Sequence, residues 1–224
     1  MTSNEKQDWI LGKNASPLSG DFSDDIAFDD NKIAFAVRHC SKKDVLDLGC
    51  VQHNPENHKS KFWLHKALRE VSGTILGMDI YEPGVEYLRG QGFNVVLGDA
   101  QSFDLGRKFD VIVAGDLIEH LDNLGGFLAS CRKHLRPGGE LLISTPNPWY
   151  WRHIVKAALR GRVGVNREHT LWLCPTTLSQ LARRYDFAVD DVEFGSRYKQ
   201  DLLMPLPRGI KHRSFHAVLR LAAN

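Results

Sequence analysis

The sequence predicts an α/β fold: a doubly wound sheet of about seven strands, mostly parallel with the last strand antiparallel, and a cap insertion after the fifth strand. Two observations carry this prediction. Short apolar runs alternate with segments whose apolar residues recur at helical spacing, as a parallel sheet covered by helices requires. Most of the runs end in an acidic residue or a glycine, which is typical of the carboxyl edge of such a sheet, where ligands bind.

The composition is that of an ordinary globular protein. The chain has 224 residues, 42% of them hydrophobic and 25% charged, with a formal net charge of +2, so the charge balance does not point to a nucleic-acid partner. The four cysteines are far apart and form no Cys-x-x-Cys pair, so we expect reduced thiols in a cytoplasmic protein. No run has the apolar length of a secretion signal or a membrane span.

Residues 1–43 are expected to form an N-terminal lid or helical segment ahead of the main domain, residues 44–224. Five aspartates gather in residues 21–30 around a few apolar side chains, which suits either a solvated loop or a lid over an active site. Apolar residues at helical spacing within Asp30–Cys40 then predict a short helix that feeds the first strand.

Five strands and their helices follow in alternation. The predicted strands are Val45–Gly49, Thr74–Ile80, Phe93–Leu97, Phe109–Ala114 and Glu140–Thr145. The predicted helices cover residues 56–71, a segment opened by Glu82-Pro83, and residues 121–135, each with an apolar stripe or a start signal. Arg136-Pro137-Gly138-Gly139 is expected to turn the chain into the fifth strand.

The alternation stops after the fifth strand. Residues 146–175 are rich in Trp and Arg and predict a cap insertion over the carboxyl edge of the sheet. Thr177 followed by Gln180 has the spacing of a capping box and predicts a helix through Tyr185. Two further strands, Phe187–Phe194 and His216–Leu221, are expected on either side of a basic loop over residues 198–213.

The turn after the first strand decides between cofactors. A dinucleotide site would place Gly-x-Gly-x-x-Gly there and an acidic residue about 20 positions later. Only Gly49 is present, and the acid that ends the second strand, Asp79, comes thirty positions after it. Because the glycines that cradle a pyrophosphate are missing, a phosphate-rich cofactor is disfavoured.

In order and spacing, residues 44–146 resemble a class I S-adenosylmethionine-dependent methyltransferase, which has a Rossmann-like fold. Val45-Leu46-Asp47-Leu48-Gly49-Cys50 is similar to the family's first motif, and Gly77-Met78-Asp79-Ile80 to the strand whose acid takes both ribose hydroxyls. Gly98-Asp99-Ala100 resembles the turn that reads the adenine amino group. Residues 109–114 with Glu119-His120, and then Leu135–Gly139, match the fourth strand and the turn before the fifth.

The resemblance implies S-adenosyl-L-methionine as the cofactor. This molecule has a ribose, an adenine and a cationic sulfonium with an amino-acid tail, so acids at the strand ends suit it. Turn formation or helix capping is the other explanation for any single aspartate. The expected cofactor-binding residues are Asp47, Gly49, Cys50, Asp79, Ile80, Asp99, Ala100, Gly115 and Asp116.

Val51 and His53 stand where the family usually has glycines. Val51 lacks the freedom of glycine at positive φ, so the loop must take another path or hold the methionine tail differently. A degenerate, non-catalytic Rossmann-like binding protein is therefore an alternative to an enzyme.

The expected reaction is methyl transfer to a small molecule or a glycan or lipid precursor. The motifs are similar to O-methyltransferases of the ubiquinone-biosynthesis and sugar- or antibiotic-tailoring types, which favours an oxygen acceptor and a base that removes its proton. The candidate bases are His120, beside Glu119, and His169, inside the cap insertion. A structural histidine bonded to backbone is the alternative for each.

No metal site is expected, because His53, His58 and His65 show no ligand spacing with nearby acids. No nucleic-acid partner is expected either. Asn147-Pro148-Trp149-Tyr150 superficially resembles a motif of amino-methylating nucleic-acid enzymes, but it follows the fifth strand rather than the fourth. The chain also has no separate basic recognition domain.

Residues 149–160 predict an amphipathic helix with Arg152, Lys156 and Arg160 on its polar face. It suits a cap helix packed on the body, a surface helix that contacts anionic lipid, or a basic rim that attracts a phosphorylated acceptor. The expected partner is therefore a small-molecule acceptor, anionic or presented at a membrane, with peripheral membrane contact through this helix as one alternative.

Overall fold

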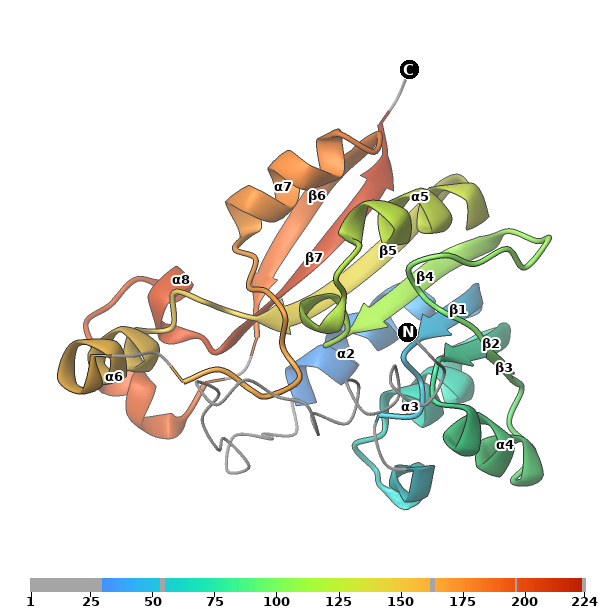
Figure 1. Cartoon of the computed structure of the whole chain (residues 1–224), viewed down its shortest axis with the longest axis horizontal. Helices are drawn as coiled ribbons and strands as arrows, with labels where there is room; N and C mark the ends of the chain where they lie inside the picture. Colours follow the sequence, from blue (N-terminus) through green and yellow to red (C-terminus); the bar gives the residue numbers. More distant parts are fainter. Residues whose placement is uncertain (1–29, 53–54, 162–163, 196, 223–224) are drawn as a thin grey trace.

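The structure, a computed structural model, describes residues 30–52, 55–161, 164–195 and 197–222. Its centre is a seven-stranded sheet in the order β3-β2-β1-β4-β5-β7-β6, and β7 runs antiparallel to both of its neighbours (Figure 1). The strands are β1 (Asp44–Leu48), β2 (Thr74–Asp79), β3 (Val95–Leu97), β4 (Phe109–Gly115), β5 (Leu135–Pro146), β6 (Phe187–Phe194) and β7 (Ser214–Leu221). The predicted fold class is confirmed.

Helices cover both faces of this sheet. The longer ones are α2 (Asp30–Cys40), α3 (Leu64–Val71), α4 (Glu82–Gly90), α5 (Leu124–His134), α6 (Trp151–Arg160) and α7 (Pro175–Arg183). The shorter ones are η2 (Pro55–Lys59), η3 (Ile118–His120), η4 (Lys199–Leu203) and α8 (Arg208–Lys211). Helices α5 and α7 pack on one face and α2 and α3 on the other, whereas α6 and α8 lie beyond the end of β5 (Figure 1). Among the described residues, no helix has both the length and the apolar character needed to cross a bilayer.

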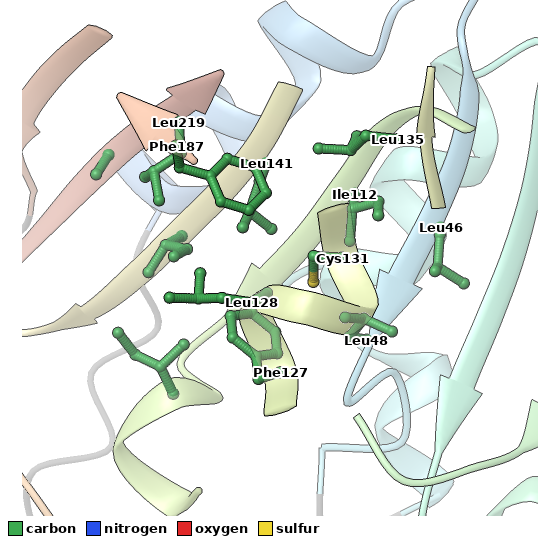
Figure 2. Close-up of a cluster of buried hydrophobic side chains, with 14 of the residues drawn as sticks. Leu46, Leu48, Ile112, Phe127, Leu128, Cys131, Leu135, Leu141, Phe187 and Leu219 are labelled. Carbon is green, nitrogen blue, oxygen red and sulfur yellow. The ribbon is translucent and has the colours of Figure 1, made fainter. Parts of the chain in front are cut away.

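The main core lies between the sheet and helices α5 and α7. Figure 2 shows Phe127, Leu128 and Cys131 of α5 facing side chains of the central strands. Leu46 and Leu48 of β1 belong to this layer. Val45 of the same strand belongs to the cluster on the opposite face, which α2 and α3 cover, so β1 is buried on both sides. This explains why the strands are nearly continuous apolar runs.

Asp47 is the exception in β1, and it forms a buried polar pair. Its carboxylate lies 2.9 Å from Nδ1 of His65 on α3, and the two residues are 2% and 1% exposed. The His65 ring packs against Trp63, with ring centroids 5.2 Å apart. A carboxylate so far from water needs a partner, so this pair fixes the start of α3 against the end of β1.

Replacing His65 with Leu should lower the free energy of unfolding by about 3 kcal/mol, because it leaves the Asp47 carboxylate buried without its partner. Urea denaturation measures this change. Adding Asp47→Asn to His65→Leu removes the buried charge and should recover part of the loss. An unaltered stability of the single variant would show that the pair contributes nothing.

Two predicted helices differ from the structure. The one over 56–71 is η2 followed by α3, because the indole Nε1 of Trp63 donates to the Cys50 carbonyl at 2.7 Å and holds Trp63 extended. The one over 121–135 is α5, which begins only at Leu124, because the Asn123 side chain accepts the Gly126 N–H at 2.9 Å and caps the start of the helix.

Several boundaries also differ. Strand β5 starts at Leu135, which pairs with Phe109 across a register shift, so the predicted turn is an irregularity within the strand. Strand β3 is shorter than predicted, and β7 begins at Ser214, two residues before the predicted start. Helix α7 is capped by a box of Cys174 and Thr177, not Thr177 and Gln180. The loop predicted over 198–213 contains η4 and α8. Of the predicted lid or helical segment over residues 1–43, residues 1–29 lie outside the described residues, and the helix expected within Asp30–Cys40 is α2.

Candidate functional site

The turn after β1 carries the first part of the candidate site. Gly49 has a φ of 76°, and a Cβ there would lie 3.2 Å from Cδ1 of Leu117, so the position needs glycine. Gln52 is the second left-handed residue, with a φ of 53°. Val51 is buried and has no positive φ. The loop therefore takes a path whose backbone angles a valine can adopt. His53 lies outside the described residues.

Asp79, at the end of β2, is bonded to this turn. One of its oxygens accepts the Val51 N–H at 2.8 Å and the other accepts the Tyr81 N–H at 2.9 Å. These two bonds fix the orientation of a half-buried carboxylate. Ile80 lies next to it and is also half-buried.

Asp99 and Ala100 form the turn after β3, and both are half-buried. Oδ1 of Asp99 accepts the Gln101 N–H at 3.0 Å. The Gln101 side-chain oxygen in turn accepts the backbone N–H of Asp122 at 3.1 Å and of Asn123 at 2.6 Å. The turn is thereby tied to the segment between β4 and α5, which carries the next group of site residues.

Gly115 ends β4, and Asp116, which follows it, is paired with Lys32 of α2. Lys32 Nζ lies 2.6 Å from Asp116 Oδ2, and the Ser144 hydroxyl lies 3.2 Å from Oδ1. Partial loss of water would raise the pKa of Asp116, but the Lys32 ammonium outweighs this and holds the pKa below its ordinary value. A Cβ on Gly115 would lie 2.7 Å from Cδ2 of Leu64 and 3.7 Å from Cδ of Lys32, so a larger residue there would displace the Leu64 side chain.

Glu119 lies one turn further on, inside the protein, and is 1% exposed. Its Oε2 accepts the Thr145 hydroxyl at 2.9 Å, and its backbone carbonyl accepts the Thr170 N–H at 2.8 Å. Burial, and secondly the negative charge of Asp116, raise the pKa of Glu119 to about 8. Two neighbouring carboxyl groups thus have pKa values pushed in opposite directions, as is typical of functional sites.

His120 and His169, predicted separately from two distant segments, lie against each other. Their ring centroids are 4.8 Å apart with the planes at 90°. Nδ1 of His120 is 4.0 Å from Oε2 of Glu168, a separation at which a carboxylate still acts electrostatically on the ring. The bond from Thr170 to the Glu119 carbonyl holds the segment with His169 over the end of β4.

Two of the predicted cofactor residues point away from this edge. The Asp47 carboxylate is paired with His65 in the interior. The Cys50 thiol is buried against Gly77, and a Cβ on Gly77 would lie 2.8 Å from Sγ of Cys50. Burial raises the pKa of this thiol well above its ordinary value. Asp47 lies within β1, and Cys50 contributes only its backbone to the turn.

The sequence predicted no metal site, but the fold brings three donors together. One ligand atom from each of Glu119, His120 and His169 lies within 4.8 Å of the others. This set could hold a divalent cation. Sequence spacing could not reveal it, because His169 comes from a different segment of the chain.

Lys32 and Thr145 join the candidate site in the structure, and the sequence did not predict either of them. Lys32 lies on a helix before the first strand, where a lysine usually has no special role. A signal for Thr145 existed, since it ends a predicted strand at the ligand-binding edge. No local signal existed for Lys32, because its partner Asp116 is distant in sequence.

The buried Glu119 predicts a particular dependence of stability on pH. Its pKa in the folded protein, about 8, lies above the ordinary value of 4.5, so the folded state holds a proton that the unfolded chain releases. The resulting stabilisation is complete below pH 4.5 and is lost as the pH rises towards about 8. Glu119→Gln, which stays neutral, should flatten this decline in urea denaturation between these pH values. Parallel profiles for the two proteins would contradict the raised pKa.

A sequence profile of the methyltransferase domain matches residues 26–192. A probable S-adenosylmethionine-dependent methyltransferase of Mycolicibacterium smegmatis is 29% identical over 158 residues, which cover 69% of this chain and 56% of that protein. A ubiquinone biosynthesis O-methyltransferase of Rickettsia akari is 22% identical over 167 residues, which cover 70% of this chain and 63% of that protein. The chain thus spans less than two thirds of the length of either relative.

Solved structures share the fold. The CcbJ methyltransferase from Streptomyces caelestis superposes with a TM-score of 0.63 at 18% identity, covering 87% of this chain and 90% of that one. The glycopeptide N-methyltransferase MtfA in complex with sinefungin gives a TM-score of 0.60 at 19% identity, covering 92% and 98%. Enzymes that bear this fold therefore include one named for methylation at nitrogen, so the fold alone does not identify the acceptor atom.

Proposed function

Because this chain belongs to the methyltransferase-domain family, and its relatives include a probable S-adenosylmethionine-dependent enzyme, we propose that it methylates an oxygen of a small molecule or of a glycan or lipid precursor. One observation carries the proposal: two histidines from separate segments meet at the edge of the sheet where Asp79 and Asp116 end their strands. A base beside a cofactor site is what transfer to a hydroxyl requires.

The acids at this edge fit the chemistry of S-adenosylmethionine. The Asp79 carboxylate is fixed by two backbone N–H groups, and a two-oxygen acceptor suits the two vicinal hydroxyls of a ribose. Asp99 in the next turn is assigned to the adenine amino group, with Ile80 and Ala100 as apolar neighbours of the adenine ring. Gly49, which has no side chain, allows backbone and ligand to approach closely.

The Lys32–Asp116 pair is suited to the amino-acid tail of the cofactor. The tail is a zwitterion, so it needs one cationic and one anionic partner, and this pair supplies both at a separation of 2.6 Å. The α-amino group is assigned to Asp116 and the α-carboxylate to Lys32. Asp47 is assigned an indirect role, in which it supports the turn through its pair with His65.

Lys32→Met should weaken the binding of S-adenosylhomocysteine by about tenfold to a hundredfold, because a bond to a charged group is lost. Methylthioadenosine has the same nucleoside but no amino-acid tail, and its dissociation constant should not change. Calorimetric titration of both ligands measures this, and Lys43→Met, an exposed lysine outside the site, is the control. Equal weakening of the two ligands would contradict the assignment of Lys32.

When bound, S-adenosylmethionine supplies an electrophilic methyl group, and the protein positions the acceptor and handles its proton. We assign the removal of the acceptor's proton to His120. Glu168 would stabilise the imidazolium that forms, and the His169 ring would hold the His120 imidazole in place. Glu119 stays protonated at neutral pH, since its pKa is about 8. It therefore adds no second negative charge next to Asp116.

The proposal is tested by transfer of a labelled methyl group from S-adenosylmethionine to a panel of catechols, sugars and primary amines. We expect label on hydroxyl oxygens, and anionic members of the panel should react faster, because residues 150–175 carry five basic residues and one acidic residue. Label on amines alone would contradict the oxygen assignment. Cofactor binding with no transfer to any class would favour the non-catalytic binding protein.

A further inference from the structure

Six of the seven large hydrophobic side chains exposed in the described residues gather in one part of the molecule. We call this part the lobe, and define it as residues 149–161 and 197–213, which include α6, η4 and α8. Helices α6 and α8 contain no buried residue, and the buried residue of η4 is an aspartate. The exposed side chains are Trp149, Ile154, Val155, Leu159, Leu202 and Leu203.

Polar contacts, rather than apolar packing, hold the lobe together. The buried Asp201 accepts bonds from Tyr150 Oη at 2.8 Å, Trp151 Nε1 at 3.0 Å, Arg152 Nε at 3.2 Å and the Tyr198 N–H at 2.9 Å. These bonds fix α6 beside η4. The apolar side chains of both helices are therefore left on the surface, where Leu159 is 81% and Leu203 is 86% exposed.

The lobe also concentrates positive charge. Asp201, its sole acidic residue, is buried and faces inward, while the basic residues number eight in a chain with a net charge of +2. A second copy of the chain would bring a similarly basic surface against this one, which disfavours self-association. The basic residues are Arg152, Lys156, Arg160, Arg197, Lys199, Arg208, Lys211 and Arg213.

We propose that the lobe docks on an anionic lipid surface. Leu159 and Leu203 enter the headgroup boundary, Trp149 lies at the interface, and the surrounding cations attract the lipid phosphates. The segment that follows α6 carries His169, so docking would bring the catalytic edge towards acceptors held in the membrane. This docking surface is larger than the single amphipathic helix that the sequence predicts, because η4 and α8 add further apolar and basic residues to it.

Sedimentation of the full chain with lipid vesicles tests this surface without any need for methyl transfer. We expect retention on vesicles of equal parts phosphatidylcholine and phosphatidylglycerol at low salt, and release in about 1 M salt, where the Debye length is about 3 Å. Leu159→Glu and Leu203→Glu should each weaken partitioning onto the vesicles by about tenfold or more, because a charge replaces a leucine that the lipid would bury. Leu97→Glu makes the same change at a 47% exposed leucine outside the lobe and should leave partitioning unaltered.

Titration of S-adenosylhomocysteine into the two lobe variants separates this proposal from the proposed function. Unaltered binding shows that the fold and the cofactor site survive the substitutions. The proposal is overturned if anionic vesicles fail to retain the native chain at low salt, or if neutral phosphatidylcholine vesicles retain it equally. Self-association that both variants abolish, without vesicle binding, would instead make the lobe a contact between copies of the chain.

Discussion

Replacing Asp79 with Ala should weaken the binding of S-adenosylhomocysteine by about a hundredfold or more. The substitution removes two charge-assisted bonds to the ribose, each contributing about 1.5–3 kcal/mol. It also frees the N–H groups of Val51 and Tyr81, so the turn after β1 loses its connection to β2. Calorimetric titration measures the dissociation constant directly.

Asp79→Asn is the matched variant, because it keeps one acceptor oxygen and the size of the side chain. Its loss of affinity should be intermediate. Circular dichroism of both variants shows whether the fold is kept. An unchanged dissociation constant for Asp79→Ala in a folded protein would remove Asp79 from the ribose site.

The second large effect concerns turnover rather than affinity. His120→Ala should lower the rate of methyl transfer to the most reactive hydroxyl of the panel by about a hundredfold to ten-thousandfold, the range of general-base catalysis. The dissociation constant of S-adenosylhomocysteine should stay the same, because the assigned cofactor residues are untouched. His169→Ala should give a smaller loss, since His169 positions His120 in this account.

Chelation distinguishes the base from a metal ligand, since His120 is also one of three clustered donors. If His120 acts as a base, turnover should survive dialysis against EDTA and should rise with pH as the imidazole loses its proton. Turnover that disappears on chelation and returns with a divalent cation would assign Glu119, His120 and His169 to a metal instead.

Much of the fold could be predicted, because both faces of the central sheet are buried and the central strands are nearly continuous apolar runs. The strand Phe187–Phe194 has the predicted bounds. The helix boundaries were less predictable, because they depend on contacts from outside the segment. The bond from the Trp63 indole to the Cys50 carbonyl is such a contact, and it separates η2 from α3.

The candidate site was predictable where its residues follow strands, as Asp79 and Asp116 do, since parallel strands bring their carboxyl ends to one edge. Asp47 shows where that reasoning was incomplete. It lies one residue before the end of β1, and helices cover both faces there, so its side chain is in the interior with His65. Lys32 was missed because its role depends on the packing of α2 over β4.

A crystal structure of the chain with S-adenosylhomocysteine tests the central claim most directly. We expect ribose hydroxyls on the Asp79 carboxylate, the amino-acid tail between Lys32 and Asp116, and the sulfur atom facing His120 and His169. A ribose away from Asp79, or a sulfur atom that faces away from the two histidines, would contradict it.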